Sequence, residues 1–203
     1  MTSNHGINKL CIIGVGLIGG SLAIALKRAG YCSKVTGAGR NTERLQIALD
    51  LKVVDAFSTD ISEAVSDADM IFVAVPMGAM AAVFEKIDGH VKPDAVITDG
   101  GSAKVSVIDD AKQHLKQSYS QFVAGHPIAG TEQSGVEAAF GELYQNRKII
   151  ITPTDETDSS AVEKVISMWL AAGAEVETMS AEQHDDVLAG TSHLPHLLAG
   201  HIL

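Results

Sequence analysis

The chain has 203 residues, of which 46% are hydrophobic, and a formal net charge of −10. This much apolar sequence supports a sizeable core and argues against a disordered chain. The acidic balance argues against a nucleic-acid partner, because phosphate binding needs a basic face. The two cysteines, Cys11 and Cys32, have the spacing of neither a zinc site nor a disulfide framework, which predicts a cytoplasmic protein.

The N-terminal region predicts a strand, a tight turn and a helix. An apolar run over Leu10–Ile13 is followed by a glycine cluster, and a helical pattern from Ser21 to Ala29 ends at Gly30. The glycines interrupt the apolar stretch, so it is predicted to be neither a signal peptide nor a membrane span. A second strand over 34–40 and a helix that Thr42 would cap come next.

The rest of the chain continues the alternation of strands and helices. Strands are expected in 69–76, 95–104, 121–130, 148–154 and 174–179, and helices over 78–87, 104–115 and 159–173. The strand in 69–76 is apolar throughout, which is typical of the middle of a parallel sheet. The pattern predicts an α/β fold with a doubly wound, mostly parallel Rossmann-like sheet, which we assign to residues 1–179.

Residues 180–203 have a different character, since they form one long helical pattern with no strand after it. Ser180 and Gln183 are spaced as a capping box, and Pro195 would kink the helix. We interpret this segment as the first helix of an all-helical domain that is mostly absent from this chain. The alternative is a terminal helix that docks back on the sheet domain.

The glycine cluster has the spacing of a dinucleotide-binding turn. Its first glycine would make the tight turn, the second would let a pyrophosphate approach the backbone, and the third would let the helix pack against the strand. The start of the helix would offer free N–H groups to the phosphates. The alternative is a glycine-rich turn without a ligand. The predicted cofactor contacts are Gly14, Gly16, Leu17, Ile18, Gly19, Arg40, Val75 and Pro76.

The end of the second strand bears on which dinucleotide would bind. NAD sites place an acidic residue near this point, where it holds a ribose hydroxyl. This chain has Gly39 followed by Arg40. An arginine without a carboxylate favours the 2′-phosphate of NADP, although NAD stays open because Arg40 could instead stack on adenine.

His126 stands between Gly125 and Pro127, a setting that favours an extended loop over a helix. In a doubly wound sheet, ligands bind beyond the carboxyl ends of the strands. Ser102, in "DGGSAK", and His126 both follow predicted strands, so they are expected at this edge, facing a nicotinamide. The alternative is that His126 is a polar loop residue without a functional role.

Four stretches together resemble the prephenate dehydrogenase family, also called arogenate or cyclohexadienyl dehydrogenases: "GVGLIGGSLA", "DGGSAK", "GHPIAGTEQSG" and "HDDVLAGTSHLPHLLA". The resemblance runs from about Lys9 to Leu203. It implies NAD- or NADP-dependent oxidative decarboxylation of prephenate or arogenate in tyrosine biosynthesis. It also implies that His126 accepts the proton of the ring hydroxyl, while Ser102 hydrogen-bonds that hydroxyl and His126.

The resemblance further implies a substrate side of the site. Thr131 and Glu132 would line or gate it, and His184, His193 and His196 would lie near the substrate. Family members carry a helical C-terminal domain that forms a homodimer and supplies an arginine for the substrate carboxylate. This arginine has no counterpart that can be placed here, so a dinucleotide-binding fragment without a complete substrate site is the alternative function. A different hydroxy-acid dehydrogenase is a weaker alternative, because it would not need the "HPIAG" and "SHLPH" stretches.

Three histidines near the C-terminus, His184, His193 and His196, are residues of a type that can bind a metal ion. No cysteine or well-placed carboxylate completes a tetrahedral set with them, so we expect no metal. The sequence does not distinguish prephenate from arogenate and does not address feedback by tyrosine.

Overall fold

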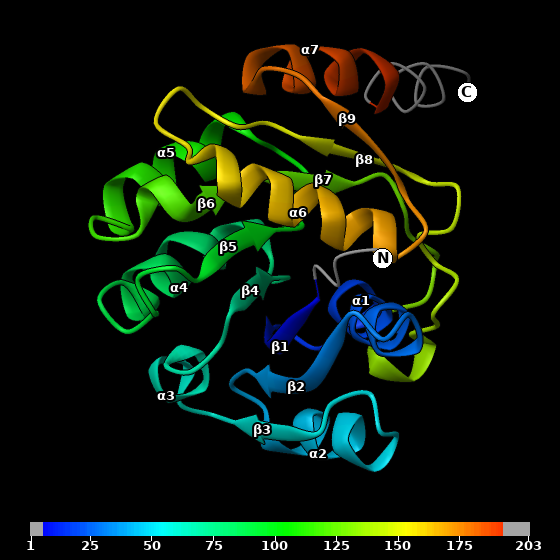
Figure 1. Ribbon diagram of the computed structural model, residues 1–203. Coiled ribbons are helices and arrows are strands. Elements are labelled where there is room, and N and C mark those ends of the chain that lie inside the picture. Colours follow the sequence, from blue (N-terminus) through cyan, green and yellow to red (C-terminus); the bar gives the residue numbers. More distant parts are fainter. Residues whose placement is uncertain (1–5, 193–203) are drawn as a thin grey trace, which may run out of the picture.

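The computed structural model describes residues 6–192, which form an α/β fold with two sheets (Figure 1). The strands are β1 (Ile7–Ile13), β2 (Cys32–Ala38), β3 (Ala56–Ser58), β4 (Met70–Val73), β5 (Val96–Asp99), β6 (Phe122–Val123), β7 (Gly125–Pro127), β8 (Lys148–Ile151) and β9 (Glu175–Thr178). The α-helices are α1 (Leu17–Arg28), α2 (Thr42–Asp50), α3 (Ile61–Val65), α4 (Met80–Ile87), α5 (Val105–His114), α6 (Ser159–Ala171) and α7 (Ala181–Ser192).

The larger sheet has six strands in the order β3-β2-β1-β4-β5-β6, and every neighbouring pair is parallel. This is the strand order of dinucleotide-binding folds, in which the chain reverses its direction of travel across the sheet between β1 and β4. The predicted doubly wound, mostly parallel sheet is therefore confirmed. In such sheets, ligands bind in the crevice expected beyond the carboxyl ends of the strands at this reversal, which are β1 and β4 here.

A second sheet of three strands follows in the order β7-β8-β9. Strand β7 is antiparallel to β8, and β8 is parallel to β9. The sequence predicted one short strand in 121–130, but the chain forms two strands there and changes sheets between them at Ala124. His126 therefore lies on β7 and not on a loop, because the extended geometry that precedes a proline also suits a strand.

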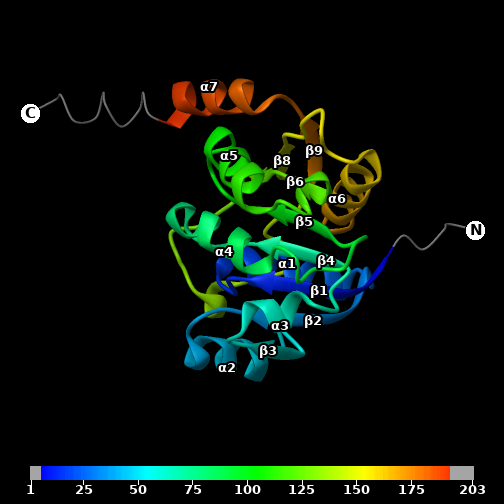
Figure 2. The same cartoon turned by 90° about the vertical axis from the view of Figure 1, so that its left-hand side faces the viewer.

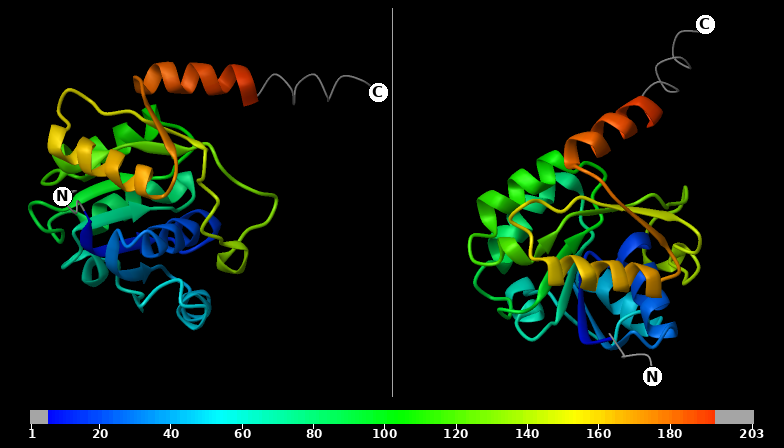
Figure 3. Two further views of the ribbon diagram at one scale, coloured as in Figure 1. Left: turned by 45° about the vertical axis from the view of Figure 1, so that its right-hand side comes forward. Right: turned by 45° about the horizontal axis from the view of Figure 1, so that its top comes forward.

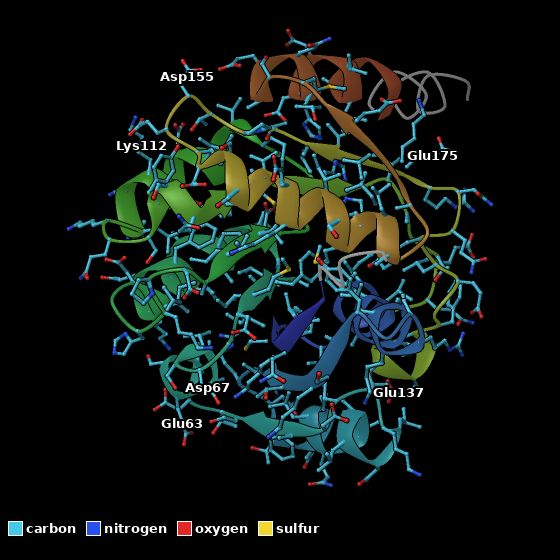
Figure 4. All side chains as sticks on the ribbon, viewed as in Figure 1. Glu63, Asp67, Lys112, Glu137, Asp155 and Glu175 are labelled. Carbon is cyan, nitrogen blue, oxygen red and sulfur yellow. The ribbon has the colours of Figure 1, made fainter. Side chains whose placement is uncertain are left out.

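Helices cover both faces of the larger sheet: α3, α4 and α5 lie to its left in Figure 1 and α1 to its right, and Figure 2 looks onto the face that α3, α4 and α5 cover. Helices α1 and α6 contribute to the core on one face, and α3, α4 and α5 contribute to the core on the other. Side chains of β1 alternate between the two cores, with Leu10 and Ile12 on the first and Cys11 and Ile13 on the second. Charged side chains that Figure 4 labels, such as Asp67, lie on the periphery.

Local details differ from the sequence prediction in three places. Helix α1 begins at Leu17 and not at Ser21, because the helix accommodates two of the glycines. Helix α2 is capped by Asn41, whose side chain accepts the backbone N–H of Arg44 at 3.0 Å, so Thr42 is not the cap. Strand β3 and helix α3 were not predicted, because three and five residues are too short for a periodic pattern.

Helix α7 lies along one end of the molecule, beyond α5 and the second sheet (Figures 1 and 3). Ser180 accepts the backbone N–H of Gln183 at 3.1 Å, which is the serine half of the predicted capping box. The predicted kink at Pro195 lies outside the described residues, as do His193 and His196. Over residues 6–192, every helix is too short or too polar to cross a membrane.

Candidate active site

Backbone hydrogen bonds align the ends of the central strands at one edge of the larger sheet. Gly14 donates to the carbonyl of Ala38 at 2.9 Å, Ala74 donates to Ile13 at 2.8 Å, and Gly100 donates to Val73 at 3.0 Å. Each donor is the residue that directly follows its own strand, so the loops after β1, β4 and β5 leave the sheet side by side. The glycine turn and the "DGGSAK" loop are thereby neighbours of the same crevice.

The three glycines of the turn differ in how much space surrounds the position of a Cβ atom. Gly14 has a φ of +93°, and a Cβ there would lie 2.3 Å from the carbonyl oxygen of Ala74. A Cβ on Gly19 would lie 2.5 Å from the carbonyl oxygen of Gly14, so only glycine allows α1 to pack so close to β1. Gly16, the N-cap of α1, has no atom within 4 Å of a Cβ position. The open space at Gly16 and the free N–H groups of the first turn of α1 suit a phosphate group.

The other predicted cofactor contacts lie around this turn. Arg40 is exposed, shortly after the end of β2, and forms no ion pair with any residue of the described part of the chain. Val75 borders the turn, since its Cγ1 would lie 3.2 Å from a Cβ on Gly14. Pro76 is exposed next to it. Leu17 and Ile18 form the first turn of α1.

A buried ion pair joins the loop that carries Ser102 to the strand that carries His126. Nζ of Lys104 donates to Oδ2 of Asp99 at 2.6 Å and to the carbonyl of Gly125 at 2.7 Å. Asp99 also accepts the backbone N–H of Gly125 at 2.9 Å. Both charged side chains are 0% exposed. Burial lowers the pKa of Lys104, and the nearby Asp99 carboxylate opposes that shift.

A second chain of contacts connects His126 to α7. Nδ1 of His126 lies 2.9 Å from Nε2 of His184, and Nδ1 of His184 lies 2.7 Å from Oδ1 of Asp185. Asp185 in turn accepts the backbone N–H groups of Lys104 at 2.8 Å and Val105 at 3.0 Å. The first turns of α7 are therefore bound to β7 and to the start of α5.

The surroundings of His126 favour its neutral form. Burial lowers the pKa of His126 to about 4, helped by the charge of Lys104 and by His184, whereas Asp185 acts in the opposite direction. A neutral imidazole has one nitrogen with a lone pair, so His126 can accept a proton at neutral pH.

Ser102 and His126 line one cavity of about 600 Å³. Its walls come from the loop after β5, from β7 and the loop that follows it, and from α7. The lining residues are Ser102, Ala103, His126, Pro127, Ile128, Ala129, Asp185, Leu188 and Ala189. The loop that carries Ser102 also touches the glycine turn, since a Cβ on Gly100 would lie 3.4 Å from Cγ2 of Ile18. A hydroxyl and a proton-accepting imidazole thus share a cavity beside the candidate nucleotide crevice.

Three predicted substrate residues, His184, Thr131 and Glu132, belong to the described part of the chain and are not among the residues that line the cavity. His184 is 0% exposed and packs behind His126 instead of facing the cavity. Thr131 and Glu132 are exposed on the loop after β7, where Thr131 accepts the backbone N–H of Gln133 at 3.2 Å. Within residues 6–192, no three His, Cys, Asp or Glu side chains are placed to hold a metal ion.

Sequence reasoning missed three residues that organise the site: Asp99, Lys104 and Asp185. All three stand in stretches singled out for their motifs, "DGGSAK" and "HDDVLAG", but they were given no role. A signal for Asp99 was present in the sequence, because a carboxylate at the end of an apolar parallel strand lies at the edge where ligands bind. The contacts of Asp185 with α5 depend on how α7 docks, which no local pattern encodes.

The sequence of the chain matches a known protein family. The domain described as "prephenate dehydrogenase, nucleotide-binding domain" matches residues 22–178. The chain belongs to the prephenate dehydrogenase family. The resemblance noted in the sequence motifs is thereby confirmed.

Individual members of the prephenate dehydrogenase family are similar in sequence and structure. A cyclohexadienyl dehydrogenase of Zymomonas mobilis is 40% identical over 94% of this chain and 64% of its own length. A prephenate dehydrogenase from A. aeolicus, solved with hydroxyphenyl propionate and NAD+, has a TM-score of 0.87 and 37% identity over 95% of this chain and 66% of its own. A Synechocystis arogenate dehydrogenase has a TM-score of 0.85 and 32% identity, covering 92% of this chain and 65% of its own.

The chain spans between about half and two thirds of the length of its first curated relatives, namely 64%, 54% and 52%.

Proposed function

We propose that the protein catalyses the NAD- or NADP-dependent oxidative decarboxylation of prephenate or arogenate, a step of tyrosine biosynthesis. The observation that carries this proposal is the cavity in which Ser102 and His126 meet, beside a dinucleotide-type glycine turn, in a chain of this family.

In the proposed reaction, His126 takes the proton of the ring hydroxyl and Ser102 hydrogen-bonds the same hydroxyl. A bound NAD or NADP supplies the acceptor for the hydride. Loss of carbon dioxide then leaves an aromatic phenolate, which takes up a proton to become the phenol, so the overall step is strongly downhill. A base positioned in this way typically contributes about 10²- to 10⁴-fold to the rate. The low pKa of His126 keeps the base unprotonated at neutral pH.

For the cofactor, we propose that Gly14, Gly16, Leu17, Ile18 and Gly19 hold the pyrophosphate, with Val75 and Pro76 at the border of the site. Arg40 would hold the 2′-phosphate of NADP. The guanidinium is exposed and forms no ion pair with residues 6–192, which supports this preference, and so does the absence of a carboxylate among the residues that directly follow β2.

Further parts of the proposal concern the substrate and the assembly. Thr131, Glu132, His193 and His196 would serve the substrate side of the site. Residues 180–203 would begin a helical domain that forms a homodimer, following a dinucleotide-binding domain over 1–179.

The test uses the full-length protein with prephenate or arogenate and either dinucleotide, and follows the absorbance of the reduced nicotinamide. The wild type is expected to turn over one of the two substrates. His126→Asn should lose most turnover while its cofactor affinity survives, and retained turnover would reject His126 as the base. Cofactor binding by the wild type without turnover of either substrate would instead favour a dinucleotide-binding module.

A further inference from the structure

The imidazole of His184 is the one polar side chain of α7 that is completely buried among the residues whose side chains are described, 181–189. It does not line the cavity, yet its Nε2 lies 2.9 Å from Nδ1 of His126. Its other ring nitrogen faces Asp185. A buried imidazole between a candidate base and a carboxylate can decide where the protons of that base reside.

The direction of these hydrogen bonds is set by the backbone at the start of α5. The N–H groups of Lys104 and Val105 can only donate, so both oxygens of Asp185 act as acceptors. The pKa of Asp185 is lowered because the hydrogen bonds from Lys104, His184 and Val105 outweigh the effect of burial, so the carboxylate is ionised at neutral pH. An ionised carboxylate has no proton to give. The bond at 2.7 Å therefore requires a proton on Nδ1 of His184.

When each of the two imidazoles carries a single N–H, one arrangement of protons satisfies the remaining contact. A neutral imidazole carries one N–H, so His184 protonated at Nδ1 offers a lone pair at Nε2. The contact at 2.9 Å then requires the proton of His126 on its Nδ1. The lone pair of His126 is then on Nε2, the ring nitrogen that does not contact His184.

We propose that His184 and Asp185 are positioning residues that hold His126 in the Nδ1–H tautomer, so that its Nε2 is free to accept the proton of a substrate hydroxyl in the cavity. The inference deepens the proposed function and rests on it, since His126 must be the base. It also gives α7 a role in catalysis: the helix that follows the second sheet brings both positioning residues to β7.

The charged groups around His126 support this arrangement. From β5 and the loop after it, Asp99 and Lys104 form a buried pair whose cation acts on His126. From α7, Asp185 is directed at His184 and not at His126. The cation disfavours a second proton on His126, and the carboxylate fixes the orientation of His184.

The test is the ring ¹⁵N spectrum of His126 in the full-length protein at neutral pH, assigned through the signal that His126→Asn removes. We expect a protonated Nδ1 and an unprotonated Nε2 in the wild type. Asp185→Asn should shift His126 to a mixture of tautomers, because an amide can donate as well as accept. Asp186→Asn, at the exposed neighbouring position, should leave the spectrum unchanged. A wild-type spectrum with the proton on Nε2, or an unchanged tautomer in Asp185→Asn, would overturn the proposal.

Turnover provides the second readout. His184→Phe keeps a ring but removes both nitrogens, and should lower kcat by about 10- to 100-fold, within the range that a positioned base contributes, with KM little changed. His184→Gln, whose side-chain oxygen can replace Nε2 as an acceptor, should recover part of that loss. If His184→Phe and His184→Gln both fold and have equal activity, the positioning role is rejected.

The two proposals fail in distinguishable ways. The ring spectrum needs neither substrate nor cofactor, so it reports the tautomer whatever reaction the protein catalyses. Retained turnover in His126→Asn rejects the proposed function, whereas an unaltered tautomer in Asp185→Asn rejects the positioning role.

Discussion

The carboxylate of Asp185 on α7 accepts the backbone N–H of Lys104 at 2.8 Å, and that of Val105 at 3.0 Å, although about 80 positions separate them in the chain. These two N–H groups stand at the start of α5. The N-cap residue of α5, Lys104, forms no capping hydrogen bond with its side chain. A residue from another helix therefore accepts two of the N–H groups that the start of a helix leaves without an intrahelical partner. The same carboxylate orients His184, so helix capping and the organisation of the site share one residue.

Asp185→Ala is expected to lower the free energy of unfolding by about 1–2 kcal/mol, the usual cost of removing an N-cap acceptor. The pKa of Asp185 is lowered in the folded protein, so this contribution is present at neutral pH and is lost as the pH falls through the folded-state pKa, which lies below the ordinary aspartate value. Urea denaturation at neutral and acidic pH measures both effects. Asp186→Ala is the matched control and should change stability by less than about 0.5 kcal/mol. Equal losses in the two variants would contradict the capping role.

The buried pair of Lys104 and Asp99 is expected to be far more sensitive than a surface pair. Lys104→Met leaves Asp99 charged and 0% exposed, which should cost about 3–5 kcal/mol. Lys112→Met removes the cation of the exposed pair with Glu156 and should cost at most about 1 kcal/mol. Adding Asp99→Asn to Lys104→Met should restore part of the stability, because the uncompensated charge is gone. A double variant no more stable than Lys104→Met would argue against this explanation.

Gly14 and Gly16 are expected to respond to alanine in opposite ways. Gly14→Ala should lower the free energy of unfolding by about 2–6 kcal/mol, from about 1–3 of strain at positive φ and about 1–3 of overpacking against Ala74. Gly16→Ala should leave stability nearly unchanged, since nothing lies within 4 Å, but should weaken dinucleotide binding about 5- to 100-fold through an overpacking cost of about 1–3 kcal/mol.

Thermal unfolding and fluorescence titration with the reduced dinucleotide separate these two outcomes. Gly130→Ala is the matched control, because it also has no atom within 4 Å and lies on a different loop. Unimpaired binding by a folded Gly16→Ala would remove the assignment of this turn to the pyrophosphate.

The sequence was most informative where a local pattern determines the structure. The apolar run of β1 and the spacing of Gly14, Gly16 and Gly19 predicted a strand, a turn and a helix, because the close backbone approaches at Gly14 and Gly19 leave no room for a Cβ. Ser102 and His126 could be placed at one edge, because parallel strands end together. The position of His184 was not predictable, since helical periodicity does not say which face of α7 meets β7. The second sheet was hidden because glycine and proline within β7 mask its strand pattern.

Arg40→Asp is expected to weaken the binding of NADP by about 10- to 100-fold, because the 2′-phosphate would lose a charge-assisted hydrogen bond worth about 1.5–3 kcal/mol. The binding of NAD should change little, since NAD lacks the 2′-phosphate. Isothermal titration with each dinucleotide measures the ratio. Lys116→Asp alters the net charge equally at an exposed position beyond the end of α5, and should leave both affinities unchanged. Equal losses for the two dinucleotides in Arg40→Asp would remove the assignment of Arg40 to NADP.

The last prediction concerns the pH dependence of turnover. A base must be unprotonated to accept a proton, so kcat/KM should fall as the pH drops through the pKa of His126 in the free enzyme. Burial and the cation of Lys104 lower that pKa to about 4, so the acidic limb should lie well below the ordinary histidine value of about 6.5. Lys104→Gln removes the cation and should move the limb toward higher pH, whereas Lys112→Gln, at an exposed site, should not move it. A limb that stays in place in a folded Lys104→Gln variant would show that this cation does not set the pKa of the base.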